Sequence, residues 1–256
     1  MKLAFIWATV LIGLIGCESE APTSEPITIG HRGLPTLFPE NTKESFDGLL
    51  NGGIYSVETD ILMAAGDTVM IFHDPEVSRL TNLTGATITM TPETLKKGIK
   101  EKSGGTGLTL AEFFTLYETR FELIFLDLKG GQDDAIRNLI DQVITMIQTK
   151  KLYAKVVITS PNADNLEYIQ SIDPDIKLAI DENELGVKTA ISHHFGYCLL
   201  SIDNMSKSLY SFSNSANVKL IAYTTQNIIE VEKAITLGCD GIMTDVPLEM
   251  RKLSSK

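Results

Sequence analysis

Apolar runs rich in β-branched residues alternate along the chain with segments whose apolar positions recur every three or four residues. Several runs are almost continuously apolar, which is typical of parallel strands covered on both faces. The predicted strands are Ile27–Ile29, Tyr55–Met63, Val69–Phe72, Leu123–Leu128, Lys155–Thr159, Lys177–Ile180, Tyr197–Ile202, Lys219–Tyr223 and Gly241–Thr244.

The segments between these runs have helical patterns. The clearest is Asp133–Gln148, whose apolar residues within Ile136–Ile147 fall on one helix face. Thr109–Glu112 and Asn227–Glu230 have the spacing of capping boxes, and Gly238 stands where a helix C-cap belongs. Strand and helix therefore alternate, which predicts an α/β fold with a parallel sheet.

Leaving out Val69–Phe72, eight main strands remain. That number predicts a (β/α)8 TIM barrel, with its active site at the carboxyl ends of the strands. An open doubly wound sheet is the structural alternative. A polar stretch, Ser78–Gly107, interrupts the alternation after the second strand. We interpret residues 64–107, approximately, as a small insertion that lies over the barrel mouth.

The N-terminus predicts export and a lipid anchor. Lys2 precedes an apolar run, Leu3–Ile15, which has the basic start and short apolar core of a secretory signal. The run ends at Gly16 and Cys17, which resembles the bacterial lipoprotein signal. We expect a signal peptide at 1–16, a lipidated Cys17 on a tether at 17–26, and the barrel domain at 27–256. The protein would then be exported and anchored to a membrane, facing the periplasm or cell exterior. The alternative is an ordinary signal peptide or short anchor.

The composition limits the fold class and the binding partners that the protein can have. The 256 residues are 43% hydrophobic and 21% charged, as expected for one globular domain. The formal net charge of −11 argues against nucleic acid as a nonspecific partner. Beyond Cys17, Cys198 and Cys239 lie in apolar surroundings and are expected to be small buried residues, although a disulfide stays open.

Paired charges close two of the predicted strands. Glu58 and Asp60 are two residues apart, so their side chains share one face of a strand that should be buried. Buried carboxylates need a cation or strong hydrogen bonds, and a divalent ion such as Mg2+ or Ca2+ is the simplest partner. Asp127 and Lys129 repeat this spacing on the next barrel strand, where one could complete a metal site and the other hold a phosphate oxygen. The alternatives are two solvated acids and a plain salt bridge.

Two histidines follow predicted strands. His31 and Arg32 lie between Gly30 and Gly33 just after the first strand, and His73 follows Val69–Phe72 beside an aspartate. Histidine exchanges protons near neutral pH, and the arginine fork fits phosphate. His193 and His194 lie in a polar connection and are expected at the surface. The sequence has no serine-hydrolase elbow, Walker loop or dinucleotide fingerprint.

Taken together, these motifs resemble the glycerophosphodiester phosphodiesterases over nearly the whole chain from Ile27 to Pro247. The matching segments, in order, are His31-Arg-Gly33, Pro39-Glu-Asn-Thr42, Glu58-x-Asp60, His73-Asp74, Arg79-x-Thr81, Gly85, Thr109-Leu-x-Glu112, Asp127-x-Lys129 and Gly238-Cys-Asp-Gly-Ile-Met-Thr-Asp-Val-Pro247.

The resemblance implies a (β/α)8 barrel and divalent-metal-dependent cleavage of glycerophosphodiesters into glycerol 3-phosphate and an alcohol. It also implies roles for matched positions. His31 and His73 would be the general acid and base, Arg32 and Lys129 phosphate ligands, and Glu58 and Asp60 metal ligands.

Two positions depart from the family pattern. Asp127, the expected third metal ligand, stands where the family usually has glutamate, and Tyr223 stands where it often has tryptophan. Tyr223 should flank the glycerol end of the substrate. Two alternative functions remain open: a membrane-anchored binding protein for phosphate-containing solutes, and a related phospholipid head-group phosphodiesterase.

Overall fold

Eight parallel strands close into a barrel in the computed structural model, which describes residues 25–130, 134–182 and 185–253. The first strand pairs with both the last strand and β2, which excludes an open sheet. β3 pairs antiparallel with β2 outside the ring. The predicted TIM barrel with an insertion after the second strand is confirmed. The strands are β1 Ile27–His31, β2 Ser56–Ala64, β3 Thr68–Ile71, β4 Leu123–Leu128, β5 Val156–Ser160, β6 Lys177–Asp181, β7 Tyr197–Ser201, β8 Lys219–Thr225 and β9 Gly241–Thr244.

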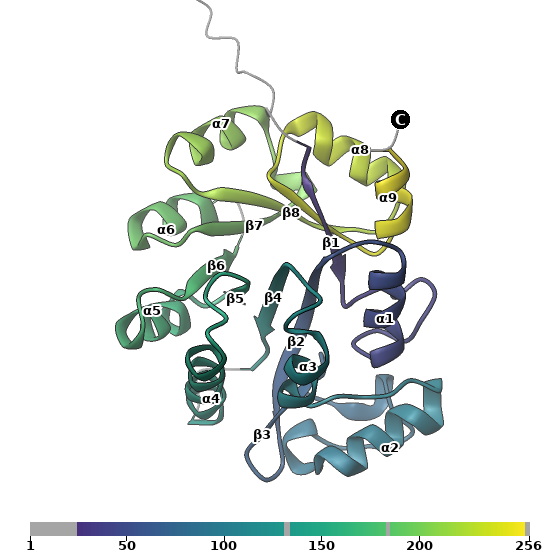
Figure 1. The fold of residues 1–256 in the computed structure, drawn as a ribbon. Coiled ribbons are helices and arrows are strands. Elements are labelled where there is room, and N and C mark those ends of the chain that lie inside the picture. Colours follow the sequence, from purple (N-terminus) through teal and green to yellow (C-terminus); the bar gives the residue numbers. More distant parts are fainter. Residues whose placement is uncertain (1–24, 131–133, 183–184, 254–256) are drawn as a thin grey trace, which may run out of the picture.

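Helices surround the barrel (Figure 1). The apolar face predicted on the long helix after β4 is buried against the barrel, and the Thr109–Glu112 capping box is formed. The helices are α1 Lys43–Asn51, α2 Pro92–Ser103, α3 Leu110–Tyr117, α4 Asp134–Lys150, α5 Ala163–Ile172, α6 Gly186–His193, α7 Lys207–Ser215, α8 Ile228–Leu237 and α9 Pro247–Leu253. Short 3-10 helices are η1 Val77–Arg79, η2 Thr87–Thr89 and η3 Ile202–Asn204.

An apolar plug fills the barrel below its mouth. Its side chains come from seven of the strands and point inward, so the barrel has a packed core rather than a pore. The plug consists of Ile29, Phe125, Val157, Ala179, Tyr197, Leu199, Ile221 and Met243. Inward-facing residues two positions further along several strands are polar, and these build the site described below.

The insertion packs mainly beside the barrel. Helix α2, missed in the sequence, buries Leu95 and Ile99 against the β2–β3 hairpin, and Figure 1 shows it at the edge of the molecule. Its start at Thr91-Pro92 and its left-handed cap at Gly104 are ordinary helix signals that were available. Of residues 64–107, only His73 lines the central cavity. Helix α2 lies beside the barrel because an amphipathic helix must bury its apolar face. That the insertion lies over the barrel mouth stays a prediction.

The predicted signal peptide and most of the tether, including Cys17, lie outside the described residues. Among the helices that the structure does describe, none is both long and apolar enough to span a bilayer.

Candidate active site

The sheet register brings the predicted strand-end residues together. His31 on β1 is the ladder partner of Glu58 on β2, and Asp60 on β2 is the partner of Asp127 on β4. Parallel strands of one barrel end at the same rim, so residues far apart in the sequence meet there. Which residues meet depends on the order and the register of the strands, which the sequence pattern did not give.

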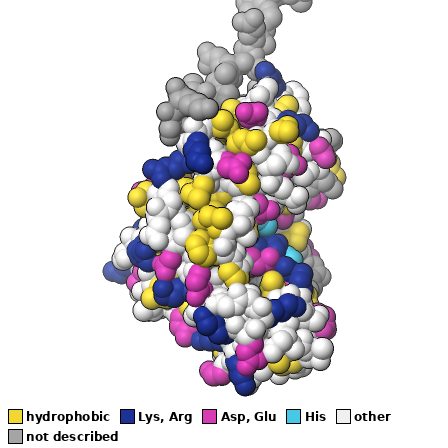
Figure 2. All heavy atoms as spheres, turned by 90° about the vertical axis from the view of Figure 1, so that its right-hand side faces the viewer, with side chains coloured by type: hydrophobic (Ala, Val, Ile, Leu, Met, Phe, Trp, Pro, Cys, Tyr) yellow, Lys and Arg dark blue, Asp and Glu magenta, His cyan; other side chains and the backbone are white. Residues whose placement is uncertain are grey.

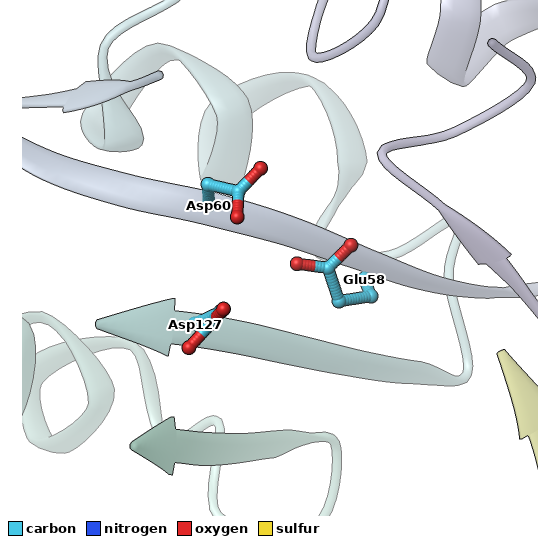
Figure 3. Close-up of side chains that lie close together, drawn as sticks. All are labelled: Glu58, Asp60 and Asp127. Carbon is cyan, nitrogen blue, oxygen red and sulfur yellow. The ribbon is translucent and has the colours of Figure 1, made fainter. Parts of the chain in front are cut away.

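Three carboxylates converge at this rim. Oxygen atoms of Glu58, Asp60 and Asp127 all lie within 4.8 Å of one another, and all three residues are buried. Figure 3 shows their carboxylates pointing toward a common centre from two neighbouring strands. Asp127 reaches this cluster despite having a shorter side chain than glutamate. The alternative of solvated acids is excluded for this set.

The electrostatics of the cluster favour a bound cation. Burial, together with the neighbouring Asp60 and Asp127, raises the pKa of Glu58 well above its usual range. Burial also raises the pKa of Asp127 to about 7. Its Oδ1 atom is buried without a hydrogen-bond partner among the described residues. Buried acids with an unsatisfied oxygen fit a hard divalent cation, which takes oxygen ligands.

Two cations border the carboxylates. Lys129 Nζ lies 2.5 Å from Asp127 Oδ2 and 3.2 Å from Asp60 Oδ1. Arg32 Nε lies 3.1 Å from Asp60 Oδ2, a close charge contact without hydrogen-bond alignment. Although burial disfavours the charged acid, Arg32 and Lys129 lower the pKa of Asp60. The salt bridge of Asp127 with Lys129, which was the alternative to a functional pair, is present, and it lies within the site.

The backbone turns sharply at Arg32 and places this residue beside the carboxylates. Arg32 itself has φ 54° and Gly33 has φ 89°, and a Cβ on Gly30 would lie 2.4 Å from the Gly33 carbonyl oxygen. This turn directs the Arg32 backbone N–H to Glu58 Oε2 at 3.0 Å. The two glycines therefore permit the close backbone approach that this turn requires.

Each strand-end histidine is held by an aspartate through Nδ1. His31 Nδ1 lies 2.6 Å from Asp245 Oδ1, and His73 Nδ1 lies 2.5 Å from Asp74 Oδ1. A carboxylate only accepts hydrogen bonds, so Nδ1 carries the proton in both rings. Nε2 is then the atom of each ring that can exchange a proton with a bound molecule.

A cavity of about 440 Å³ opens among these groups. Both histidines line it, and Figure 2 shows histidine side chains among acidic and basic ones on a recessed part of the surface. Tyr223 also lines the cavity. Every predicted acid–base, phosphate and metal residue except Asp60 lines this cavity, and Asp60 lies directly behind it in contact with Arg32 and Lys129.

Sequence reasoning gave no role to three contributors. Asp245 follows β9 and holds His31, and Asp181 closes β6 and faces the cavity. Both stand at the carboxyl ends of strands, which is the signal that identified Asp127. Asn41 is the third. Its side chain donates to Asp60 Oδ2 at 2.7 Å and accepts from Thr59, a link that only the folded β1–α1 loop creates.

Residues expected to be uninvolved lie elsewhere. His193, on α6, pairs with Glu167, and neither His193 nor His194 lines the cavity. Cys198 and Cys239 are free and buried, which excludes a disulfide between them.

The fold and this site define a class: a (β/α)8-barrel protein with an acidic metal-type centre flanked by two histidines and two cations. The model of the glycerophosphoryl diester phosphodiesterase family matches residues 31–249, and the chain belongs to this family. The predicted enzyme class, a glycerophosphodiester phosphodiesterase, is thereby confirmed over the binding-protein alternative.

Individual proteins with similar sequences or structures are also phosphodiesterases of this kind. A glycerophosphodiester phosphodiesterase of Caldanaerobacter subterraneus subsp. tengcongensis is 28% identical over 244 residues, covering 90% of this chain and 98% of the relative. The solved phosphodiesterase of Oleispira antarctica, in complex with the product sn-glycerol 3-phosphate, superposes with a TM-score of 0.77 at 21% identity, covering 90% of this chain and 97% of its own. The glycerophosphodiester phosphodiesterase of Agrobacterium tumefaciens gives a TM-score of 0.75 at 19% identity, covering 89% and 100%. These structures share the fold.

Proposed function

We propose that this protein hydrolyses glycerophosphodiesters to glycerol 3-phosphate and an alcohol, with one divalent cation. The observation that carries the proposal is the single cavity in which His31 and His73 face the carboxylate cluster and its two cations. A solute-binding protein needs no such acid–base pair. The product bound by the Oleispira antarctica relative supports glycerol 3-phosphate as the product here.

Glu58, Asp60 and Asp127 would hold the cation, and their all-oxygen set suits Mg2+ or Ca2+. When bound, it would withdraw negative charge from the phosphodiester oxygens. With Arg32 and Lys129, the ionised cluster carries one net negative charge. A divalent cation would turn this into one net positive charge, which complements the single negative charge of a phosphodiester.

Arg32 and Lys129 would bind the non-bridging phosphate oxygens and stabilise the charge that develops on them during attack. Both already contact Asp60, so they are oriented before substrate arrives. Tyr223, on β8, lines the same cavity and would flank the glycerol moiety.

The two histidines would divide the proton transfers. One Nε2 takes the proton from the attacking oxygen as that oxygen bonds to phosphorus. The other gives a proton to the leaving alkoxide as its bond to phosphorus breaks. The attacker is water, or a glycerol hydroxyl that first forms a cyclic phosphate, which water then opens to glycerol 3-phosphate. The aspartates at Nδ1 fix the tautomer that each role requires.

A coupled assay of glycerol 3-phosphate release from glycerophosphocholine tests the proposal. Release should stop in EDTA and return with Mg2+ or Ca2+. Undiminished rates in chelator would contradict the metal assignment. No release from any glycerophosphodiester with any metal would contradict the function. Cleavage of intact phospholipid in preference to the deacylated diester would instead indicate a head-group phosphodiesterase.

We further propose that the mature protein is exported and anchored through a lipid on Cys17. The basic start, the apolar run and the Gly16–Cys17 junction support this. Radiolabelled fatty acid should enter the wild-type protein in a bacterial host and not the Cys17→Ser variant. Equal labelling of both would contradict lipidation at this cysteine.

A further inference from the structure

A continuous chain of ion pairs links His73 to Arg32 across the barrel mouth. Asp74, which holds His73, also accepts hydrogen bonds from Arg79 Nε at 2.5 Å and from Arg79 Nη2 at 3.0 Å. Arg79 also donates to both oxygens of Glu40, from Nη1 at 2.9 Å and Nη2 at 2.8 Å. Glu40 Oε1 in turn accepts from Arg32 Nη1 at 2.9 Å.

The link matters because His73 does not itself lie on a barrel strand. His31, Glu58, Asp60 and Asp127 lie on barrel strands whose register is set by parallel ladders. His73 instead follows β3, a four-residue strand outside the ring. The backbone N–H of Phe72 donates a hydrogen bond to the carbonyl oxygen of Asp60, and this bond connects the residue before His73 to barrel strand β2.

Arg79 and Glu40 come from different loops. Glu40 lies in the β1–α1 connection that also carries Arg32, and Arg79 ends η1 in the insertion. Neither residue lines the cavity of about 440 Å³. We propose that Glu40 and Arg79 are positioning residues, which hold His73 and Arg32 at a fixed separation for the reaction. The inference rests on the proposed function, because it assigns those two residues to catalysis.

The exposure of Arg79 limits what its ion pairs contribute to folding. The Arg79 side chain is 47% exposed, whereas those of Glu40 and Asp74 are each 17% exposed, and ion pairs of exposed groups contribute about 0–1 kcal/mol. Its fork nevertheless engages two carboxylates in bidentate fashion, and such geometry fixes orientation as well as adding energy. A lysine, with one point charge, cannot reproduce both forks.

The chain offers a matched control. Arg120 is 45% exposed and pairs with Asp47 at 3.0 Å, away from the cavity. Arg120→Met therefore removes the ion pair of a similarly exposed arginine that has no contact with His73 or Arg32.

The test compares Glu40→Gln, Arg79→Met, Arg79→Lys, the Glu40→Gln/Arg79→Met double variant and Arg120→Met, using glycerophosphocholine and the preferred metal. We expect kcat to fall at least about 10-fold in Glu40→Gln and Arg79→Met, because small misplacements of reacting groups are costly. Arg79→Lys should recover part of the loss. The double variant should be no worse than the poorer single, as expected for residues acting as a unit. Arg120→Met should match wild type.

Side-chain nitrogen NMR of the histidines gives a readout independent of turnover. His73 should show a protonated Nδ1 in wild type and a broadened or shifted ring signal in Arg79→Met, but not in Arg120→Met. Wild-type kcat in Arg79→Met and Glu40→Gln, or an unchanged His73 signal, would overturn the inference. So would equal losses of kcat in Arg79→Met and Arg120→Met. An inactive wild type whose His73 signal still responds to Arg79→Met would refute the proposed function but retain the positional link.

Discussion

His31 Nδ1 and Asp245 Oδ1 lie 2.6 Å apart, although 214 positions separate the two residues in the chain. The contact exists because β1 and β9 are neighbours where the barrel closes. Asp245 thus fixes which nitrogen of His31 faces the cavity, and it couples barrel closure directly to the acid–base chemistry.

Replacing Asp245 should therefore impair catalysis more than folding. We expect Asp245→Ala to lower kcat by about 10- to 100-fold, since general acid–base catalysis is typically worth 10²–10⁴-fold and a misoriented ring forfeits part of it. Steady-state kinetics measure the effect. Asp203→Asn is the control, because Asp203 is 93% exposed and pairs with Lys233. Wild-type kinetics in Asp245→Ala would remove Asp245 from the mechanism.

Replacing either cavity histidine should lower kcat more than replacing Asp245. His31→Ala and His73→Ala should each lose at least about 100-fold in kcat, because each removes one proton-transfer group. Circular dichroism should show an intact fold. His193→Ala, on α6, should keep full activity. Near-normal turnover in either cavity variant would exclude that histidine from the reaction.

Asp127 should be required for metal binding despite its short side chain. Its oxygens lie within 4.8 Å of ligand atoms of Glu58 and Asp60. Asp127→Asn should weaken Mg2+ or Ca2+ binding by at least about 10-fold in calorimetric titration, since loss of even an outer-shell partner costs 10–100-fold. Asp141→Asn, on α4, is the control. Unchanged metal affinity would mean that Asp127 forms only its ion pair with Lys129 and is not a metal ligand.

Glu44 should contribute stability that depends on pH. Its carboxylate accepts from the Thr106 backbone N–H and hydroxyl, each at 2.7 Å, which ties α1 to the end of the insertion. Partial burial favours the neutral acid, but these hydrogen bonds outweigh it and lower the pKa of Glu44 below its usual 4.5. The folded state then binds fewer protons than the unfolded state near this pKa. The stabilisation is full above pH 4.5 and is lost as the pH falls through the folded-state pKa.

Urea unfolding tests this. Glu44→Gln should be less stable than wild type by about 1 kcal/mol at pH 7, the scale of one or two net hydrogen bonds. The difference should shrink as the pH is lowered below that range. A difference that is constant with pH would show that the charge of Glu44 is immaterial.

Both internal thiols should resist modification. Burial raises the pKa of Cys198 and of Cys239 to about 12, so little thiolate exists at neutral pH. In the Cys17→Ser variant, a thiol reagent at pH 8 should react slowly with the native protein and rapidly with two thiols after unfolding in urea. Rapid reaction in the native state would contradict their burial.

Much of the fold could be predicted from local patterns in the sequence. The apolar runs, the stripe of α4 and the caps at Thr109 and Gly238 are properties of neighbouring residues, so they were readable from the sequence. Helix α2 was missed because its polar surroundings in Ser78–Gly107 masked clear cap signals at Thr91-Pro92 and Gly104.

The sequence by itself determined which side chains share a face of a strand, because the two-residue period of a strand places Glu58 with Asp60 and Asp127 with Lys129 on the same side. Only the tertiary structure decided which strand ends meet. Barrel closure joins His31 to Asp245, the β2–β4 register joins Asp60 to Asp127, and the mouth loops join Arg79 to Glu40. These contacts depend on the order and register of the strands and on loop packing, which are set by the free energy of the whole chain rather than by any local pattern.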